Sequence, residues 1–215
     1  MDFGFLRVAS EGLSVIFVSA ALCLLSALLG FFFLFLVLVL LTAFFVYFFR
    51  DPERDLPPLD QGSVICPADG KVIDISETFE DGYLKQNTRR ISIFLSIFDC
   101  HVNRSPVSGR VVGTTYYPGK FKMAFERNSS DANERLLTLI ECENGVRVVI
   151  VQVAGFLARR IVSRAKFGDE LEIGEKFGMI KFGSRVDVYL PEDVKVGVEV
   201  GQKVVAGRTV IAWLT

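Results

Sequence analysis

The strings RISIF at residues 90–94 and VRVVIV at residues 146–151 decide the fold of most of this chain. Both are short, and both are rich in the β-branched and aromatic side chains that favour strands. Similar runs begin at Gly70 and Gly109, and glycine turns separate them. We therefore predict that residues 50–215 form one mainly β domain, long enough to enclose its own core.

The end of this domain repeats itself weakly with an offset of 33 residues. The string GDEL at 168–171, followed by Gly174, is echoed by GQKV at 201–204, followed by Gly207. Such strands resemble the flattened β-sandwich of lipoyl and biotinyl carrier domains, with its hammerhead hairpins. Membrane-anchored adaptors use similar modules, so a noncatalytic adaptor is one alternative. The lysine-bearing hairpin tip of carrier domains has no convincing match here, and fold likeness alone does not decide function.

The N-terminal region carries no charged residue from position 12 to position 49. As a single helix these 38 residues would measure ~57 Å, nearly twice the ~30 Å hydrocarbon core of a bilayer. Two spans of roughly 12–29 and 31–49, with a bend at Gly30, fit better. The sequence therefore predicts an N-terminal transmembrane helical hairpin.

The positive charges at the ends of this hairpin predict its orientation. Arg7 precedes the first span, and Arg50 and Arg54 follow the second, while the bend is uncharged. By the positive-inside rule both ends, and the domain that follows, are cytoplasmic at the cell membrane. A cleaved signal peptide has a much shorter apolar region. One tilted span after an interfacial helix is the other alternative, and it would place the domain outside.

Composition supports this division into a membrane anchor at 1–49 and a β domain at 50–215, joined by the proline-rich neck RDPERDLPP at 50–58. The net charge of −1 and the lack of a basic run interleaved with aromatics argue against a nucleic-acid ligand. The cysteines have no CxxC spacing, so we expect neither a disulfide framework nor a metal site; they are Cys23, Cys66, Cys100 and Cys142.

His101 is the only histidine of the chain and lies in the polar segment DCHVNRS at 99–105. Imidazole is the one side chain whose ordinary pKa falls near neutral pH, so His101 is the first candidate for proton transfer. The structural alternative is a histidine that caps a strand and bonds to its own backbone. From this segment alone, both interpretations stay open.

The tetrapeptide FGSR at 182–185 contains the atoms for an N-to-O acyl shift. The Ser184 hydroxyl is next to the Gly183 carbonyl, and glycine has no side chain to hinder attack. Elimination from the resulting ester leaves a dehydroalanine, which hydrolyses to a pyruvoyl group. A Gly-Ser pair is more often a simple turn, so this motif gains its meaning from the rest of the chain.

Several ordered motifs together resemble the short, membrane-associated phosphatidylserine decarboxylase proenzymes of bacteria and archaea. They cover nearly all of residues 48–190 and are FFRDPER at 48–54, PADGKV at 67–72, the histidine segment, YPGKF at 117–121, NER at 133–135, QVAG at 152–155, ARRIV at 158–162 and FGMI at 177–180 leading into FGSR. The resemblance implies self-cleavage between Gly183 and Ser184 into a β chain, 1–183, and an α chain, 184–215. These two chains would form a heterodimer.

The resemblance also implies an activity. A pyruvoyl group derived from Ser184 would form a Schiff base with the serine headgroup of phosphatidylserine, and loss of CO2 would give phosphatidylethanolamine, a step of phospholipid biosynthesis. We expect His101 to reprotonate the α carbon, and Asp69 to assist Ser184 or to orient His101. No metal is expected. Further dimerisation is an expectation from the same resemblance.

Two departures from the longer relatives affect these roles. Arg104 stands where they have a second histidine, and FGSR replaces their Leu-Gly-Ser-Thr. Since a guanidinium is no base at neutral pH, His101 must serve both maturation and turnover, or Asp69 and water must share the work. Cations of the matching motifs are the candidates for binding the anionic substrate; they are Arg104, Lys120, Arg159, Arg160 and Arg185.

Three functional classes therefore remain after the sequence has been read. The first is a decarboxylase of phosphatidylserine, and the second is a decarboxylase of a related serine lipid such as archaetidylserine. The third is the noncatalytic adaptor. Nothing in the sequence distinguishes acyl from ether chains.

Overall fold

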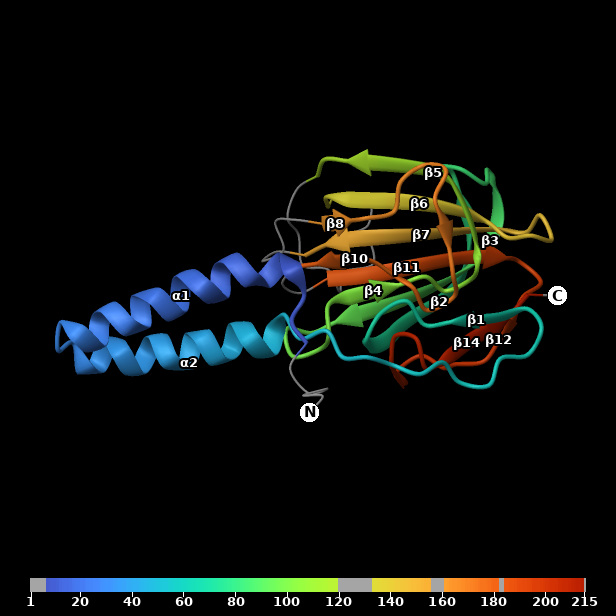
Figure 1. Ribbon diagram of the computed structural model, residues 1–215. Coiled ribbons are helices and arrows are strands. Elements are labelled where there is room, and N and C mark those ends of the chain that lie inside the picture. Colours follow the sequence, from blue (N-terminus) through green and yellow to red (C-terminus); the bar gives the residue numbers. More distant parts are fainter. Residues whose placement is uncertain (1–6, 120–132, 156–160, 182–183, 215) are drawn as a thin grey trace. The chain divides into compact units, whose positions relative to one another are not determined.

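The computed structural model describes residues 7–119, 133–155, 161–181 and 184–214. The chain divides into two compact units, Met1–Glu53 and Arg54–Thr215. The first unit contains two helices, and the second contains strands (Figure 1). The prediction of a mainly β protein with N-terminal helices is therefore confirmed.

The N-terminal unit is a pair of packed helices, α1 (Ser10–Leu28) and α2 (Phe32–Phe48). Gly30 lies between them with a positive φ of 76°, so the bend falls where the sequence predicted it. The ends of the pair meet through a backbone bond from Ala9 N–H to Phe49 O of 2.8 Å. By length and apolar composition, α1 is a candidate membrane span, whereas α2 is shorter.

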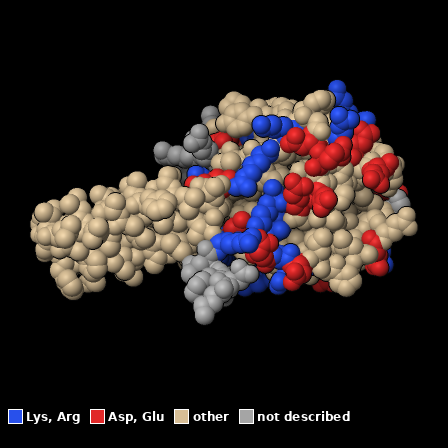
Figure 2. Space-filling view, in the orientation of Figure 1, with Lys and Arg blue, Asp and Glu red and all other residues tan. Residues whose placement is uncertain are grey.

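Three hydroxyls of these helices bond to the backbone of their own helix. The hydroxyls of Ser19, Ser26 and Thr42 each donate to a backbone carbonyl three or four residues earlier. Large apolar side chains point outward, and the Phe33 side chain is 81% exposed. In the view of Figure 2 no charged side chain covers this apolar surface, whereas both signs of charge cover the β unit.

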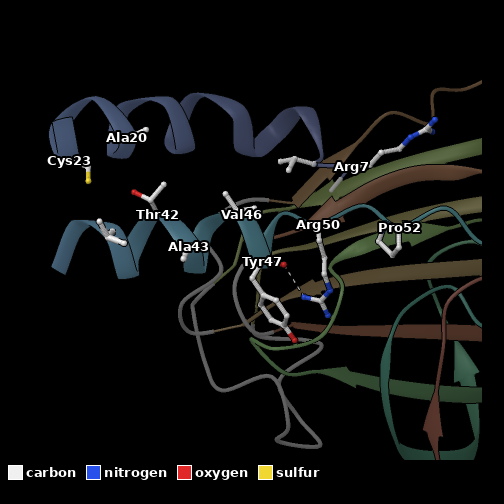
Figure 3. A pocket seen from close by; sticks show the side chains of 11 residues that line it. Arg7, Ala20, Cys23, Thr42, Ala43, Val46, Tyr47, Arg50 and Pro52 are labelled. Atoms are coloured by element: carbon white, nitrogen blue, oxygen red, sulfur yellow. Dashed lines mark hydrogen bonds between the residues drawn. The ribbon is translucent and has the colours of Figure 1, made fainter. Parts of the chain in front are cut away.

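A groove of about 710 Å³ runs between the two helices. Figure 3 shows Cys23 of α1 and Thr42 of α2 pointing into the space between them. Near the ends of the helices, the Arg50 guanidinium lies 4.1 Å from the centre of the Tyr47 ring. Its Nη1 donates to Tyr47 O at 2.9 Å, so Arg50 is held beside its own helix (Figure 3).

The β unit is built on a curled, eight-stranded antiparallel sheet (Figure 1). Its strands, in spatial order, are β13 (Lys203–Val204), β2 (Gly70–Glu80), β3 (Gln86–Leu95), β11 (Ser184–Pro191), β7 (Arg147–Ala154), β6 (Arg135–Glu141), β5 (Gly109–Tyr117) and β9 (Glu170–Leu171). The curl brings the loop after β2 to β5, where the Tyr83 and Thr115 hydroxyls lie 2.6 Å apart.

Two three-stranded sheets complete the unit. One contains β1 (Ser63–Ile65), β14 (Val210–Trp213) and β12 (Lys195–Val196), and the other contains β4 (Val102–Arg104), β10 (Lys176–Ile180) and β8 (Ile161–Ser163). The main core includes inward side chains of β3, β11 and β7 together with Phe177 and Ile180 of β10. A second apolar cluster from β6 and β7 lies on the opposite face of the large sheet.

The weak sequence repeat has a structural counterpart. Gly168 and Gly201 both have positive φ, and each donates its N–H at 2.8 Å to a residue of the strand alongside, Val111 and Val72 respectively. As a result, β9 and β13 occupy equivalent places at the two edges of the large sheet. The two halves of the sheet are therefore related by internal repetition.

Candidate active site

Ser184 is the first residue of β11, the strand between β3 and β7. It pairs with Leu95 on one side and Ala154 on the other, and its side chain is fully buried on the face of the main core. In the described part of the chain, its Oγ has no hydrogen-bond partner. Gly183 lies outside the described residues. A buried hydroxyl without a partner calls for a chemical explanation.

The chain changes sheets immediately before Ser184. β10 of the small sheet ends at Ile180, and β11 of the large sheet begins at Ser184. The predicted cleavage point therefore falls in the connection between the two sheets, and cutting there would interrupt neither strand.

His101 lies at the same end of the large sheet, after the loop that follows β3. Its backbone carbonyl accepts from Ile180 N–H at 3.3 Å, which places it beside the end of β10. Its Nδ1 lies 2.9 Å from Asp99 O, and the side chain is fully buried. Since a carbonyl oxygen only accepts, Nδ1 carries the hydrogen and Nε2 holds the lone pair of the neutral ring.

The loop that carries His101 is fixed by a short-range contact. Asp99 Oδ2 accepts from Ser96 N–H at 2.7 Å. The histidine thus makes the backbone bond that the structural alternative required. The same bond also sets the tautomer that a proton-transfer group needs, so both interpretations are compatible with this geometry.

Asp69 precedes β2 and is held mainly by an arginine. Arg54 donates to both carboxylate oxygens at 2.5 and 2.7 Å, and Ala206 N–H donates to Oδ1 at 2.8 Å. Within the described residues, the Asp69 carboxylate contacts these two groups and neither Ser184 nor His101. The structure thus places the three expected catalytic residues at one end of the sheet, with Asp69 separated from β11 by the intervening strand β3.

Cys66 lies close to this ion pair, but its thiol is unreactive. Its thiol donates to Ala68 O at 2.9 Å, and the residue is fully buried. Burial raises the pKa of the thiol to about 12, with a further increase from the Asp69 charge. At neutral pH Cys66 is therefore protonated and is no nucleophile.

The cations expected to bind substrate have different surroundings. Arg104 Nη1 donates to Gly174 O at 2.9 Å, and the residue is 7% exposed. Arg185 Nε lies 3.0 Å from Asp187 Oδ1 in a buried ion pair. Alternation along β11 puts this pair on the face opposite to the Ser184 side chain. Three further cations lie outside the described residues, namely Lys120, Arg159 and Arg160.

A buried amide pair joins β4 to β7, the strand alongside Ser184, and the sequence analysis gave it no role. Gln152 of β7 donates from Nε2 to Asn103 Oδ1 at 2.7 Å, and both residues are fully buried. A third amide, Asn133, donates from Nδ2 to Ala154 O at 2.8 Å, next to the strand position that pairs with Ser184. All three residues belong to the motifs quoted above, which was the available signal.

No metal-ligating group of three or more acidic, histidine or cysteine side chains occurs in the part of the chain that is described. What the arrangement offers is a buried serine hydroxyl, a buried histidine of defined tautomer and a buried amide pair. These groups suit intramolecular acyl transfer and proton transfer in a site from which water is largely excluded.

Comparison with known proteins agrees with this chemistry. The family model described as phosphatidylserine decarboxylase matches residues 41–212. A protein of Geotalea uraniireducens is 42% identical over 207 residues and one of Pelobacter propionicus is 46% identical over 217, each covering 96% of both chains. A protein of Ruegeria pomeroyi is 48% identical over 175 residues, with 80% of each chain covered. All three are named phosphatidylserine decarboxylase proenzyme. The chain therefore belongs to the phosphatidylserine decarboxylase family, whose members are carboxy-lyases made as proenzymes.

Proposed function

We propose that this chain cuts itself between Gly183 and Ser184 and then uses a pyruvoyl group at position 184 to convert phosphatidylserine into phosphatidylethanolamine. The observation that carries the proposal is Ser184 itself. Its hydroxyl is buried without a hydrogen-bond partner in the described residues, at the start of a central strand and directly after the connection between two sheets. A residue of purely structural value at this position would gain from a partner.

Maturation needs only the atoms of the chain and one water molecule. The Ser184 Oγ bonds to the Gly183 carbonyl carbon, the bond from that carbon to the nitrogen of residue 184 breaks, and the hydroxyl proton ends on that nitrogen. The ester then loses the proton of the residue 184 α carbon, and Gly183 leaves as a carboxylate. Water replaces the nitrogen of the remaining dehydroalanine and releases ammonia. Every step takes place at an atom of residue 184 or at the Gly183 carbonyl carbon bonded to it.

The surroundings of residue 184 fit such a group. The position is enclosed by Leu95 and Ala154, which keeps a reactive carbonyl away from bulk water. When present, the pyruvoyl group supplies the electron sink for decarboxylation. His101 is assigned to carry the proton at Nε2 that the α carbon of the headgroup receives, because its Nδ1 is already committed to Asp99 O. Asp69 is assigned to the maturation step or to the orientation of this end of the site.

Recognition of the anionic substrate is assigned to arginine and lysine side chains. The phosphodiester and carboxylate of phosphatidylserine call for cations, which we assign to Arg104, Lys120, Arg159 and Arg185. We further propose that residues 1–49 anchor the chain as a hairpin in the cell membrane, with residues 50–215 on the cytoplasmic side. The apolar helix α1 supports membrane association. The equivalent turns at Gly168 and Gly201 support the likeness to carrier-type hairpins.

Intact mass of the purified protein tests the proposal. Two chains are expected, and the smaller, 184–215, should be lighter by one ammonia than a fragment that begins with serine. Ser184→Ala should give the uncut chain and no CO2 from phosphatidylserine vesicles. A wild-type preparation that is active but contains only full-length chain would overturn the proposal. Parallel assays with ether-linked serine lipid distinguish the alternative substrate.

A further inference from the structure

Asn103 and Gln152 form a buried amide pair with unused hydrogen-bonding capacity. The two residues are 49 positions apart in sequence, fully buried, and joined by the single bond from Gln152 Nε2 to Asn103 Oδ1 at 2.7 Å. In the described part of the chain, Asn103 Nδ2 and Gln152 Oε1 have no hydrogen-bond partner. The pair thus retains one donor group and one acceptor.

The register of the strands relates this pair to Ser184, the residue that follows the predicted cleavage point. Gln152 pairs with Val186, and the next inward position of β7, Ala154, pairs with Ser184. Side chains of directly paired residues share a face, so Gln152 and Ser184 lie diagonally on the face of the main core. Asn103 pairs with Gly178 of β10, the strand that leads towards the same point.

Gly178 supplies the room that the amide pair needs. A Cβ at this position would lie 3.1 Å from Gln152 Nε2 and 2.6 Å from Val162 O. The pair therefore joins β4 to β7, the strand alongside Ser184, and it passes Gly178 of β10.

Three buried polar atoms thus have no partner among the described residues, namely Ser184 Oγ, Gln152 Oε1 and Asn103 Nδ2. They complement one another in kind, because Ser184 Oγ–H can donate to Gln152 Oε1, while Asn103 Nδ2 offers N–H donors. Burying a polar group without a hydrogen-bond partner lowers the stability of the fold, so such groups call for a functional explanation. Preorganised donors aimed at a developing negative charge are the usual large contribution to acyl-transfer catalysis.

We propose that the Asn103–Gln152 pair promotes self-cleavage. Gln152 is a positioning residue that orients the Ser184 hydroxyl, and Asn103 Nδ2 donates to the Gly183 carbonyl oxygen as that oxygen gains negative charge. During this step the bond from Oγ to carbon forms and the carbonyl electron pair moves onto oxygen. When the pair returns, the carbon–nitrogen bond breaks. The inference rests on the proposed function and assigns its first step.

A double substitution separates this role from a structural one. In Asn103→Leu/Gln152→Met both amides are replaced by apolar groups of similar shape, a change that is often nearly neutral for stability. Full-length chain is synthesised in a cell-free system with phospholipid vesicles, and the appearance of the 184–215 fragment is followed by mass spectrometry. Loss of one such donor typically slows acyl transfer about 10²–10³-fold, and we expect a decrease of that size or greater.

Thr138→Val provides the matched control. Thr138 is also fully buried, its Oγ1 has no partner among the described residues, and it lies on the same face but two strands from β11. This control should cleave at the wild-type rate.

Hydroxylamine, which cleaves esters, should not restore cleavage of the double variant, because the ester itself forms slowly. If hydroxylamine cleaved the double variant as fast as the wild type, the defect would follow ester formation and the proposal would be overturned.

A second variant keeps the test decisive if the double variant does not fold. Asn103→Asp keeps the Oδ1 acceptor for Gln152 and removes the N–H donors. Its cleavage should be slow at pH 8 and should rise as the pH falls, since protonation of the introduced carboxyl restores a donor. Wild-type cleavage with an unaffected Asn103→Asp variant at all pH values would overturn this inference alone. Failure of the wild type to cleave would instead overturn the proposed function.

Discussion

His101 has its ring fixed in one tautomer by the protein itself. The bond from Nδ1 to Asp99 O leaves the lone pair of the neutral ring on Nε2. This is the arrangement that a residue which alternately accepts and returns a proton requires. The side chain is also fully buried, so substitution is needed to separate this role from that of a histidine that only ends a strand.

Substitution of His101 should therefore slow turnover more than folding. His101→Ala should lower the rate of CO2 release by about 10²–10⁴, the usual contribution of a positioned general acid. His101→Asn is the matched control for the fold, because its amide can still donate to Asp99 O but cannot titrate. Normal cleavage together with normal CO2 release in both variants would reduce His101 to a structural residue. Loss of cleavage would assign it to maturation as well.

Asp69 combines a structural role with the catalytic role proposed for it. It binds Arg54 through both oxygens, and Ala206 N–H donates to it. Ser108 makes the equivalent backbone contact in the other half of the internal repeat, where its Oγ accepts from Ile173 N–H at 2.9 Å. Both side chains accept a backbone N–H, but only Asp69 also carries a charge that is paired with an arginine.

Asp69→Asn should accordingly lower the free energy of unfolding by about 3 kcal/mol, because it leaves the nearly buried Arg54 charge without its counter-ion. Ser108→Ala removes only one hydrogen bond at an exposed residue and should cost about 1 kcal/mol. Urea unfolding of the two variants in the uncut Ser184→Ala background measures both. Equal losses would show that the charge adds nothing. Cleavage is tested separately in the single variant Asp69→Asn, in which Ser184 is intact. If that variant is folded but uncut, Asp69 takes part in maturation.

At the scale of the strand, cleavage before Ser184 has a clear mechanical consequence. β11 is hydrogen-bonded to β3 along its whole length and to β7 along most of it. Two other strands of residues 184–215 also pair with the rest of the chain, β13 with β2 and β14 with β1. The 184–215 segment thus supplies β11 and β13 to the large sheet, and β12 and β14 to a small sheet whose third strand, β1, comes from the rest of the chain.

The two chains should therefore stay together after cleavage. In detergent without denaturant, the small fragment should elute with the large one during gel filtration, at the position of uncut Ser184→Ala. It should separate only in concentrated urea, where the main core is lost. Release of the fragment under native conditions would contradict this pairing of β11.

Sequence reasoning succeeded where the signal was local. The runs at residues 90–94 and 146–151 became β3 and β7, and Gly30 became the bend between two helices. Ser184 and His101 were singled out because their neighbours along the chain carry the motifs, and their catalytic roles stay predictions. Each of these features depends on residues within a few positions of one another.

Long-range partners were beyond that reasoning. The bond between Asn103 and Gln152 joins residues 49 positions apart, and it exists only because β4 and β7 are brought together by intervening strands. Arg54 was read as a charge that orients the membrane segment, whereas in the structure it binds Asp69. The order of strands in the large sheet is equally nonlocal, so neither composition nor periodicity determines it.

At the scale of the whole molecule, the chain separates a very apolar unit from a charged one. The helices expose large side chains, with Phe33 at 81% and Leu28 at 76% exposed. Such a surface is unfavourable in water and favourable in hydrocarbon. The β unit encloses its own core and does not depend on the helices for its inward-facing residues.

Removal of the helices should therefore free the β unit from the bilayer without unfolding it, provided that the truncation respects the Arg54–Asp69 pair. A protein starting at Arg54 should remain in the supernatant after sedimentation with vesicles, should keep the strand content of the full chain and should still cut itself. A protein starting at residue 56 loses Arg54 and should unfold at lower urea concentration, because the Asp69 charge then lacks its counter-ion. If the protein starting at residue 56 unfolded at the same urea concentration as the protein starting at Arg54, the neck would serve only as a tether. If the Arg54 protein still sedimented with vesicles, the β unit itself would carry membrane affinity that the helices had been assigned.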